Sequence, residues 1–596
     1  MKRRSLAVVL PALLVAVAAG AQQVQVREEM LPNGMRFLLV ERQDAPTVSC
    51  GFVAKVGAVN EPQGITGLTH LLEHMMFKGT RTIGTSDWAR DEAIIKQQDE
   101  VRAEMEKELT VLRGKLRRGE ISGSIYDPAN ATPRLKELKD QYEKLAAAEK
   151  DVIVKDELDQ IYTQQGASGL NAGTSEDQTF YFITLPTNKL ELWFWMESDR
   201  LSNPVMREFY SERDVVREER RLSVESTPTG QQEEAFDAMF WQSSPYSHPV
   251  IGWPSDIESV TRQQAERYVA TYYAPNNLTA VLVGDFKPDQ AMELAHRYFG
   301  RIPRGQVPPP EMVTTEPRPI AEKRMASAAE TNPEVTIRFH TVAFNHKDSF
   351  ALEVLSSLLN RRTGRLYKAL VEDKKLAVGE PTGFARDMKY EGYFELSAEI
   401  KDGVDPKSVE DGLMAELDRL GKEPVGEREL KKVKNQMLAD SFRRLQSNFY
   451  LLLQLLLYDS WGDWHYLNDS PARLQAVTAE DVQRVVKAYL SADKRSVLVF
   501  TRKAGSAPED PEIASLPPQM KPMVQKQAAA IAEMTDKAQL EQMLAQYQQG
   551  AGQAPPQVRP ALNILIKKLQ ARLEALGAAA PGGMKPPAQP QGGKEN

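Results

Sequence analysis

The stretch from Gly67 to Phe77 carries two histidines and a glutamate at a spacing that suits metal-assisted hydrolysis. His70 and His74 are four residues apart, so on a helix both imidazoles lie on one face, with Glu73 beside them. Two neutral imidazoles suit Zn²⁺, and the carboxylate can take a proton from a zinc-bound water as that water attacks a carbonyl. The chain has only seven histidines, so this pairing is rare by chance. We predict one zinc ion per chain, with His70 and His74 as ligands and Glu73 as the general base.

A catalytic zinc usually has three protein ligands, so a third is needed. The charged segment 209–220 offers several carboxylates and has a helical pattern. Glu212 and Glu219 are seven residues apart, or two turns, and share a face, whereas Glu218 points about 100° away. This favours Glu219 as the third ligand and Glu212 as the carboxylate that orients an imidazole. By spacing alone, a solvated charged face fits the segment equally well.

With the residues that follow it, Met76 to Thr80, the histidine motif resembles the inverted-zincin peptidases of family M16. This family includes pitrilysin, insulin-degrading enzyme and the mitochondrial processing peptidase. The resemblance extends over about residues 25 to 505. The other matching segments are Leu170 to Thr174 with Asp177, Thr179 and Tyr181, then Glu212 to Glu219, and then Tyr273 to Asn277.

The resemblance implies roles for several residues. It gives Glu219 as the third ligand and Glu73 as the base, in agreement with the argument from helix faces. It also implies an α+β fold, a clamshell of two related domains around a chamber, in which a peptide adds as a β-strand near Asn171 and Ala172. By residue type alone, Asn171 suits a turn equally well.

The composition indicates a large globular protein. The chain has 596 residues, of which 41% are hydrophobic, and at roughly 150 residues per domain it has room for two to four domains. This excludes disorder over the whole chain. The formal net charge of −7 gives no support for nucleic-acid binding, and a single cysteine, Cys50, excludes an intramolecular disulfide.

Residues 1–21 are predicted to be a cleavable signal peptide. They contain basic residues at the start, an apolar run from Leu6 to Ala18, and small residues before Gln22. An uncleaved membrane anchor is the alternative, although the run is short for a bilayer. No later stretch is long and apolar enough to span a membrane. We therefore expect a periplasmic or secreted protein with no transmembrane span after cleavage.

A helical insertion is predicted at about residues 88–165. Two segments, from Trp88 to about Arg118 and from Pro133 to about Gln165, are rich in Glu, Lys, Gln and Ala and repeat apolar residues every three or four positions. We interpret them as a projecting αα-hairpin with coiled-coil packing. Amphipathic helices within the main body are the alternative. The hairpin accounts for the 145 residues between His74 and Glu219, about twice the gap usual in family M16.

An internal repeat divides the chain into two halves. Residues 260–272 align without gaps onto 477–489, an offset of 217 residues. We therefore predict a catalytic zinc domain at 22–300, a proline-rich linker at 301–319, and a related domain without a zinc site at 320–505. Residues 506–596 are predicted to form a Pro/Gln-rich tail with two helices and a disordered end.

The second half departs from the family pattern. Family members that act alone carry an Arg and a Tyr there, which help to bind the substrate carbonyl, but Val371 and Val378 occupy the matching places. Neither side chain can donate a hydrogen bond. We therefore expect a partner: an M16-like chain that supplies the Arg/Tyr pair in a heterodimer, or a second copy in a homo-oligomer.

The predicted function is an exported zinc metalloendopeptidase that hydrolyses short or unfolded peptides with such a partner. One alternative is a non-catalytic subunit that binds peptides or serves as a scaffold, although a complete metal motif argues against it. Another is a zinc-dependent amidase that acts on a non-peptide amide.

Overall fold

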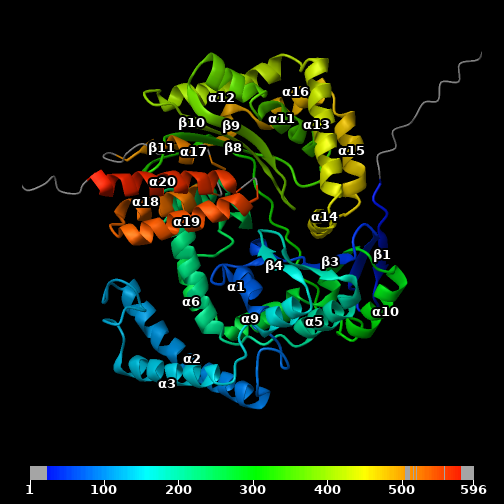
Figure 1. Cartoon of the computed structure of the whole chain (residues 1–596), viewed down its shortest axis with the longest axis vertical. Helices are drawn as coiled ribbons and strands as arrows, with labels where there is room; N and C mark the ends of the chain where they lie inside the picture. The colour runs from blue at the N-terminus through cyan, green and yellow to red at the C-terminus, as the bar shows by residue number, and fades with distance from the viewer. Residues whose placement is uncertain (1–22, 504–509, 515, 518–519, 556–557, 579–596) are drawn as a thin grey trace, which may run out of the picture.

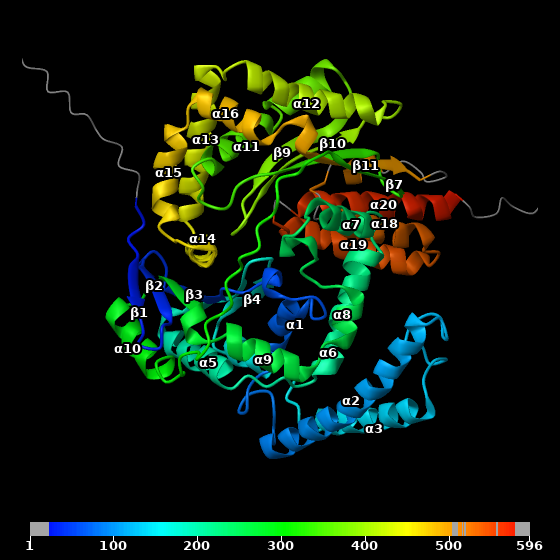
Figure 2. The same ribbon diagram turned by 180° about the vertical axis from the view of Figure 1, so that it is seen from behind.

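The computed structural model of the chain describes residues 23–578 except 504–509, 515, 518–519 and 556–557. The predicted signal peptide and nearly all of the predicted disordered end lie outside the described residues. Two sheets, each packed with helices, form two halves that lie one above the other (Figures 1 and 2). The predicted α+β fold with two related domains is confirmed.

The first half contains a six-stranded sheet with the strand order β1-β2-β6-β3-β5-β4, in which only β2 and β6 run parallel. Its strands are β1 (Arg27–Met30), β2 (Arg36–Glu41), β3 (Thr47–Ala54), β4 (Ser168–Thr174), β5 (Thr179–Pro186) and β6 (Leu278–Gly284). Its helices are α1 (Leu68–Met75), α2 (Trp88–Arg117), α3 (Pro133–Lys150), α4 (Glu157–Gln164), α5 (Leu190–Ser202), α6 (Phe209–Arg220), α7 (Gly230–Phe240), α8 (Pro254–Ser259), α9 (Arg262–Tyr272) and α10 (Pro288–Tyr298).

The second half contains a five-stranded sheet with the order β7-β11-β8-β10-β9, in which only β7 and β11 run parallel. Its strands are β7 (Lys323–Ala329), β8 (Glu334–His340), β9 (Ala377–Arg386), β10 (Tyr393–Ile400) and β11 (Arg495–Arg502). Its helices are α11 (Ser349–Leu359), η6 (Tyr367–Asp373), α12 (Pro406–Lys422), α13 (Glu427–Leu445), α14 (Asn448–Trp461), α15 (Tyr466–Ala476) and α16 (Ala479–Tyr489).

The two sheets share one topology. Apart from the extra edge strand β1, the order β2-β6-β3-β5-β4 corresponds strand for strand to β7-β11-β8-β10-β9. The sequence repeat falls on α9 and α16, which begin after Thr261 and Thr478. Both threonines cap their helix with the same reciprocal hydrogen bonds, and the helices lead into the central strands β6 and β11. The repeat therefore reflects two copies of one fold.

Each sheet is partly covered by a helix from the other half. Residues of β2, β3 and β6 alternate between two buried faces, as expected for central strands. One face packs on helices of the first half, and the other packs against four leucines of α14, a helix that is apolar all round. In return, Phe236 of α7 packs against Leu498 and Phe500 of β11.

A buried carboxylate joins α14 to the first sheet. Asp459 is fully buried and accepts hydrogen bonds from Arg36 Nη1 (2.8 Å) and Thr279 Oγ1 (2.6 Å), and it pairs with Lys55 Nζ at 2.8 Å. Because all three partners lie in the first half, the two halves are held together by charge as well as by apolar packing.

The helical insertion extends away from both sheets as a pair of adjacent helices, α2 and α3 (Figures 1 and 2). The second predicted helix is shorter than expected, because α3 ends at Lys150 and α4 is a separate helix whose Leu158 and Tyr162 pack into the core of the first half. The β-branched run Val152 to Val154 separates them, and Ile153 forms a β-bridge with Thr85.

The tail contains the short helix α17 (Pro511–Ala514) and three longer helices, α18 (Lys521–Glu533), α19 (Lys537–Gln553) and α20 (Arg559–Ala578). The three longer helices pack around a small apolar core of their own. The tail was predicted to contain two helices, but the helical segment breaks between α18 and α19, where the side chain of Asp536 caps α19. Among the described residues, no helix is long and apolar enough to span a membrane.

Candidate metal centre

Helix α1 turns its polar residues away from the core. Its leucines and Met75 are all buried in the core of the first half. The opposite face carries His70, Glu73 and His74, none of which is exposed to more than an intermediate degree. The amphipathic pattern of this two-turn helix therefore directs all three functional side chains to the same side.

The start of α1 is fixed by two features. Gly67 has φ +87°, and a Cβ there would lie 2.4 Å from the carbonyl oxygen of Ile251, so only glycine fits. The buried carboxylate of Glu61 accepts hydrogen bonds from the backbone N–H groups of Gly67 (2.7 Å) and Thr69 (2.5 Å). Burial raises the pKa of Glu61 to about 8, although these hydrogen bonds act in the opposite direction.

His70, His74 and Glu219 converge on one point. Glu219 reaches it from α6, with its carboxylate oxygens 3.8 Å from His70 Nε2 and 3.7 Å from His74 Nε2. The three ligand atoms all lie within 4.8 Å of one another. Zinc bonds of about 2.0 Å in a tetrahedron would separate donor atoms by about 3.3 Å, so small side-chain movements would bring the three into a coordination shell. This donor set fits a zinc ion.

The protonation of the two histidines differs. Burial and the neighbouring His74 lower the pKa of His70 to about 4, so His70 is neutral at pH 7, the form that ligates metals. Its Nδ1 is buried and has no hydrogen-bond partner among the described residues. Burial would also lower the pKa of His74, but the hydrogen bond with Glu212 and the charge of Glu219 raise it. A metal ion at His74 would therefore compete with a proton.

Glu212 contacts the ring nitrogen of His74 that points away from Glu219. Its Oε1 lies 2.9 Å from His74 Nδ1, so this nitrogen can donate the hydrogen bond and leave Nε2 facing Glu219. Its Oε2 pairs with Lys78 Nζ at 2.6 Å. Burial would raise the pKa of Glu212, but hydrogen bonds from His74 and Lys78 lower it to about 2. Lys78 was not predicted from the sequence, because it lies in the turn after α1 and its contact with Glu212 depends on where α6 lies.

Glu73 is oriented by the neighbouring strand. The hydroxyl of Thr174, the last residue of β4, donates a hydrogen bond of 2.6 Å to Glu73 Oε2. Burial raises the pKa of Glu73 above its usual range, while the bond from Thr174 acts against that rise. A carboxylate with a raised pKa is better suited to accept a proton near neutral pH.

Asn171 and Ala172 lie in β4, so Asn171 is in a strand and not in a turn. β4 is the edge strand of the first sheet, paired only with β5 among the described strands. The side-chain oxygen of Asn171 accepts a hydrogen bond from the backbone N–H of Ala172 at 2.9 Å. β4 also packs beside α1, so the open sheet edge ends next to the candidate metal ligands.

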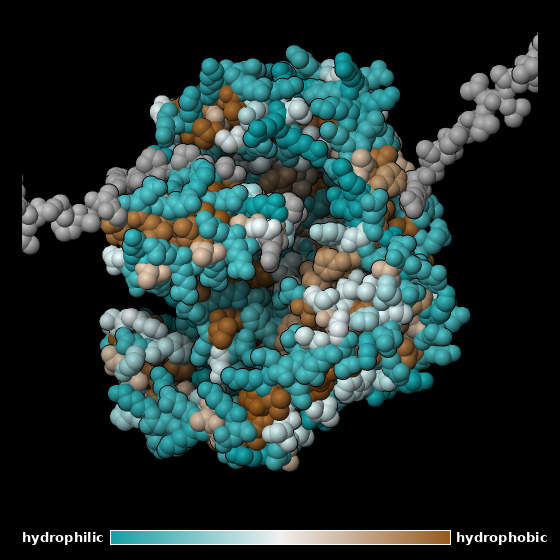
Figure 3. Space-filling view, in the orientation of Figure 1, coloured by the Kyte–Doolittle hydropathy of each residue, from teal (hydrophilic) through white to brown (hydrophobic). Residues whose placement is uncertain are grey.

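A pocket of about 320 Å³ opens beside the site. Phe77, Lys78, Ser211, Glu212 and Val215 form the wall next to the candidate ligands. Residues 153–158, which run from the segment after the hairpin into the first turn of α4, form another wall. The surface is also hollowed between the two halves of the molecule (Figure 3).

The second half brings no replacement for the missing Arg/Tyr pair at the matching positions. Val371 lies in η6 and packs partly against the core of the second half, and Val378 is half-exposed on β9. The nearby Arg365 is bound by both carboxylate oxygens of Glu429 at 2.9 and 2.6 Å. Lys434 of α13 donates to the backbone carbonyls of residues 475 and 477.

The chain matches two family models. Residues 36–121 match insulinase (peptidase family M16), and residues 259–437 match the peptidase M16 inactive domain. Both halves of the chain therefore resemble M16 peptidases.

Two relatives align with most of the chain. The zinc protease PqqE of Helicobacter pylori is 25% identical over 480 residues, which cover 79% of this chain and 91% of the relative. A probable mitochondrial-processing peptidase subunit beta of Arabidopsis thaliana is 22% identical over 484 residues, or 78% of this chain and 76% of the relative.

Solved structures support the fold. A protease from Helicobacter pylori superimposes with a TM-score of 0.65 at 22% identity, over 80% of this chain and all of the other. The periplasmic protease PqqL from Escherichia coli gives a TM-score of 0.60 at 16% identity, over 82% of this chain and 49% of the other.

Proposed function

We propose that the chain is an exported zinc metalloendopeptidase that hydrolyses short or unfolded peptides. The observation that carries the proposal is the convergence of His70, His74 and Glu219 from two helices, with Glu73 held beside them. Relatives named as zinc proteases support the choice of metal and reaction. The export signal predicted at residues 1–21 and the likeness to a periplasmic protease support a location outside the cytoplasm.

His70, His74 and Glu219 would hold the zinc ion, and Glu212 would fix the ring of His74. When bound, zinc would supply a Lewis acid that polarises the peptide carbonyl and lowers the pKa of a water molecule. Glu73 would accept the proton of that water and later donate it to the leaving amine. Thr174 would hold the carboxylate of Glu73 in the orientation that this transfer needs.

The open edge of β4 supports a peptide substrate. An extended peptide can pair with an edge strand through main-chain hydrogen bonds, and such binding is available only to unfolded or flexible segments. Asn171 and Ala172 would lie along the added strand. Because Thr174 of the same strand contacts Glu73, a peptide bond in the added strand would pass beside the base.

We propose that full activity needs a second chain. Val371 and Val378 offer no hydrogen bond to the substrate, and the loss of one such donor typically costs about 10²–10³ in rate. One relative is named as a subunit, and this chain spans about half the length of the solved PqqL protein. The partner would be an M16-like chain with the Arg/Tyr pair, or a second copy of this chain.

The test is cleavage of a quenched fluorescent peptide by the purified chain, with and without the candidate partner, together with the zinc content of the protein. Glu73→Gln is expected to keep one zinc per chain and to lose at least about 10² in rate, the usual size of general-base catalysis. Glu218→Gln is the matched control, because Glu218 lies on α6 but pairs with Arg221 away from the site.

Three outcomes would contradict parts of the proposal. Unchanged hydrolysis by Glu73→Gln would remove the mechanism. Full activity of the isolated wild-type chain would remove the need for a partner. Peptide binding without cleavage under all conditions would favour the non-catalytic scaffold in its place.

A further inference from the structure

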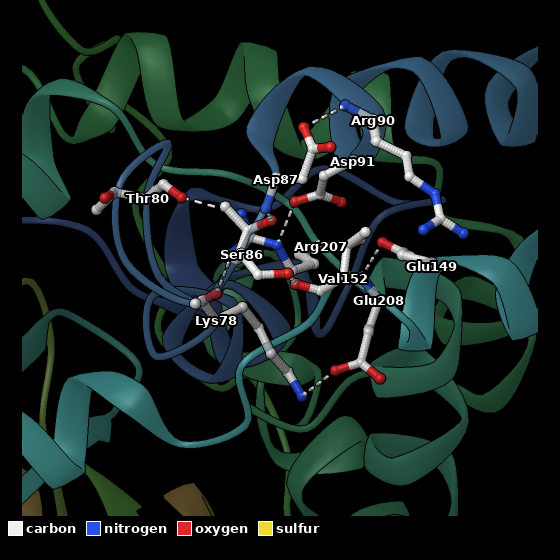
Figure 4. A network of polar contacts seen from close by, with 12 residues as sticks. Lys78, Thr80, Ser86, Asp87, Arg90, Asp91, Glu149, Val152, Arg207 and Glu208 are labelled. Atoms are coloured by element: carbon white, nitrogen blue, oxygen red, sulfur yellow. Dashed lines mark hydrogen bonds and ion pairs between the residues drawn. The ribbon is translucent and has the colours of Figure 1, made fainter.

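The root of the helical hairpin, meaning the ends of α2 and α3 nearest the sheets, carries two buried carboxylates. Asp91 lies in the first turn of α2 and is fully buried, and Glu149 lies at the end of α3 and is 2% exposed. Buried carboxylates are costly unless they are paired. Both find their partners at two consecutive residues, Arg207 and Glu208, immediately before α6 (Figure 4).

The first contact ties α2 to the turn that follows α1. Arg207 Nε donates to Asp91 Oδ2 at 2.7 Å. The same guanidinium donates to the backbone carbonyls of Lys78 (2.5 Å) and Thr80 (2.9 Å). One side chain thus connects the hairpin, the start of α6 and the segment that leaves the histidine helix.

The second contact ties α3 to the start of α6. Glu149 Oε1 accepts a hydrogen bond from the backbone N–H of Glu208 at 3.2 Å, and its Oε2 accepts one from Gln98 of α2 at 2.7 Å. Glu208 caps α6 with φ +54°, a left-handed conformation that a residue with a side chain adopts only when its surroundings hold it. Glu149 is one of the groups that hold it.

From these residues a chain of ionic contacts reaches the candidate ligands. The Glu208 carboxylate lies 3.6 Å from Lys78 Nζ, and Lys78 pairs with Glu212 at 2.6 Å. Glu212 in turn contacts His74 Nδ1 at 2.9 Å. Three side chains, those of Glu208, Lys78 and Glu212, therefore connect the hairpin root to the candidate zinc ligand His74.

We propose that the hairpin root positions the metal site: Asp91 and Glu149 clamp the start of α6 and thereby set where Glu212 and Glu219 lie. This inference rests on the proposed zinc site. Glu219 follows Glu208 by eleven residues, or about 16 Å of helix at 1.5 Å per residue. A tilt of about 5° at the clamp would move Glu219 by roughly 1.4 Å, enough to disrupt a site that needs its ligands within about 0.5 Å.

The clamp is not needed to hold the hairpin together. Met105, Leu109, Leu112, Leu135 and Leu138 form a separate apolar core between the two helices, further from the root. Apolar residues at the root would attach the hairpin to the body at least as firmly as buried ion pairs, which often cost as much as they gain. Charged groups that bond the α6 backbone and the α1 turn give position, which apolar packing does not.

The experiment uses the full chain and three variants on α3. Glu149→Ala removes both acceptors, Glu149→Gln leaves one of the two donors unpaired, and Glu143→Ala is the control at an exposed position of the same helix. Zinc affinity is measured by chelator competition, the ligand geometry by the visible spectrum of the cobalt-substituted protein, and stability by unfolding of the metal-free protein. KM and kcat for a peptide are measured in parallel.

We expect Glu149→Ala to weaken zinc binding by about 10- to 100-fold and to shift the cobalt spectrum, as loss of groups behind metal ligands commonly does. Glu149→Gln is expected to show a smaller change in the same direction. KM is expected to stay within twofold, because no hydrogen bond or ion pair joins the clamp residues to β4 in the described part of the chain, while kcat falls. Glu143→Ala is expected to match the wild type in all four measurements.

Wild-type zinc affinity and cobalt spectrum in both Glu149 variants would overturn the inference, even if their metal-free forms are less stable. If Glu149→Ala does not fold, the inference is tested by the zinc affinity and cobalt spectrum of the isosteric Glu149→Gln. Failure of the wild type itself to bind zinc would remove the proposed function and this inference together, whereas a zinc-binding wild type with unaffected variants removes only the inference.

Discussion

Thr174 offers a sharp test of how Glu73 is used. Its hydroxyl donates the 2.6 Å hydrogen bond to Glu73 Oε2, and among the described residues Thr174 makes no hydrogen bond to the three candidate ligands. Thr174→Val keeps the shape and the β-branched backbone preference and removes the donor. The variant therefore perturbs the orientation of the base and leaves the proposed zinc site intact.

The expected loss of activity in Thr174→Val follows from the strength of a hydrogen bond to a charged group. A hydrogen bond to a charged group contributes about 1.5–3 kcal/mol. Glu73 is only partly buried, so water can replace some of the lost interaction, and the lower value applies. A loss of about 1.4 kcal/mol corresponds to a tenfold lower kcat, since each 1.36 kcal/mol in the barrier is about tenfold in rate.

The assay is steady-state cleavage of a fluorescent peptide in the active form of the enzyme, with zinc content measured on the same samples. Thr184→Val is the control, because Thr184 lies on the adjacent β5 and bonds Ser49 at 3.0 Å, away from Glu73. We expect Thr174→Val to lose about tenfold in kcat with zinc content unchanged. Activity within twofold of the wild type would show that Thr174 does not orient the base, and loss of zinc would show that the substitution disturbs more than Glu73.

Four further predictions concern stability and metal binding. Asp459→Asn removes the buried negative charge and one of the two acceptor oxygens that serve Arg36, Lys55 and Thr279, so unfolding in urea is expected to show a loss of about 3 kcal/mol, with little change for the exposed Asp469→Asn. A loss under 1 kcal/mol would contradict this. Burial raises the pKa of Asp177 to about 6, so the folded chain keeps a proton that the unfolded chain has released. Its contribution to stability therefore falls by up to about 3 kcal/mol as pH rises from about 4 to 6, and Asp177→Asn is expected to flatten the unfolding profile in that window. Lys78→Met is expected to weaken zinc binding by about tenfold in chelator competition, because Glu212 loses the partner that holds it against His74; unchanged affinity would refute that role. Chelation of the wild type is expected to lower its unfolding temperature, and added zinc to restore it in a concentration-dependent way.

The sequence predicted the parts of the site that depend on helix periodicity. A spacing of four brings His70 and His74 together. A spacing of seven puts Glu212 and Glu219 on one helix face, which distinguishes Glu219 from its neighbour Glu218. Spacing within one helix has only one geometric outcome, so these residues could be chosen before the fold was known. Lys78 and Thr174 could not be found in this way. Lys78 lies in the turn after α1 and meets Glu212 of α6, and the contact of Thr174 with Glu73 depends on where β4 lies relative to α1.

The extent of the hairpin was harder to predict. The apolar repeat continues through residues 133–165, but Val152 to Val154 end α3 and a β-bridge at Ile153 returns the chain to the body. The β-branched run was visible in the sequence, while its strand partner at Thr85 was not. In the same way, the leucines of α14 showed that the helix is buried without showing which sheet covers it.

Each sheet is covered in part by a helix of the other half, and this arrangement limits the order in which the chain can fold during synthesis. Asp459 contacts Arg36 across 423 residues, so one face of the first sheet stays open until α14, about three quarters of the way along the chain, has been synthesised. Such distant contacts slow folding. A fragment ending at the linker would expose Leu38, Val40, Val53, Val281 and Val283, and would aggregate unless the second half were supplied with it. The two halves share one fold, but each relies on a helix of the other to cover its sheet.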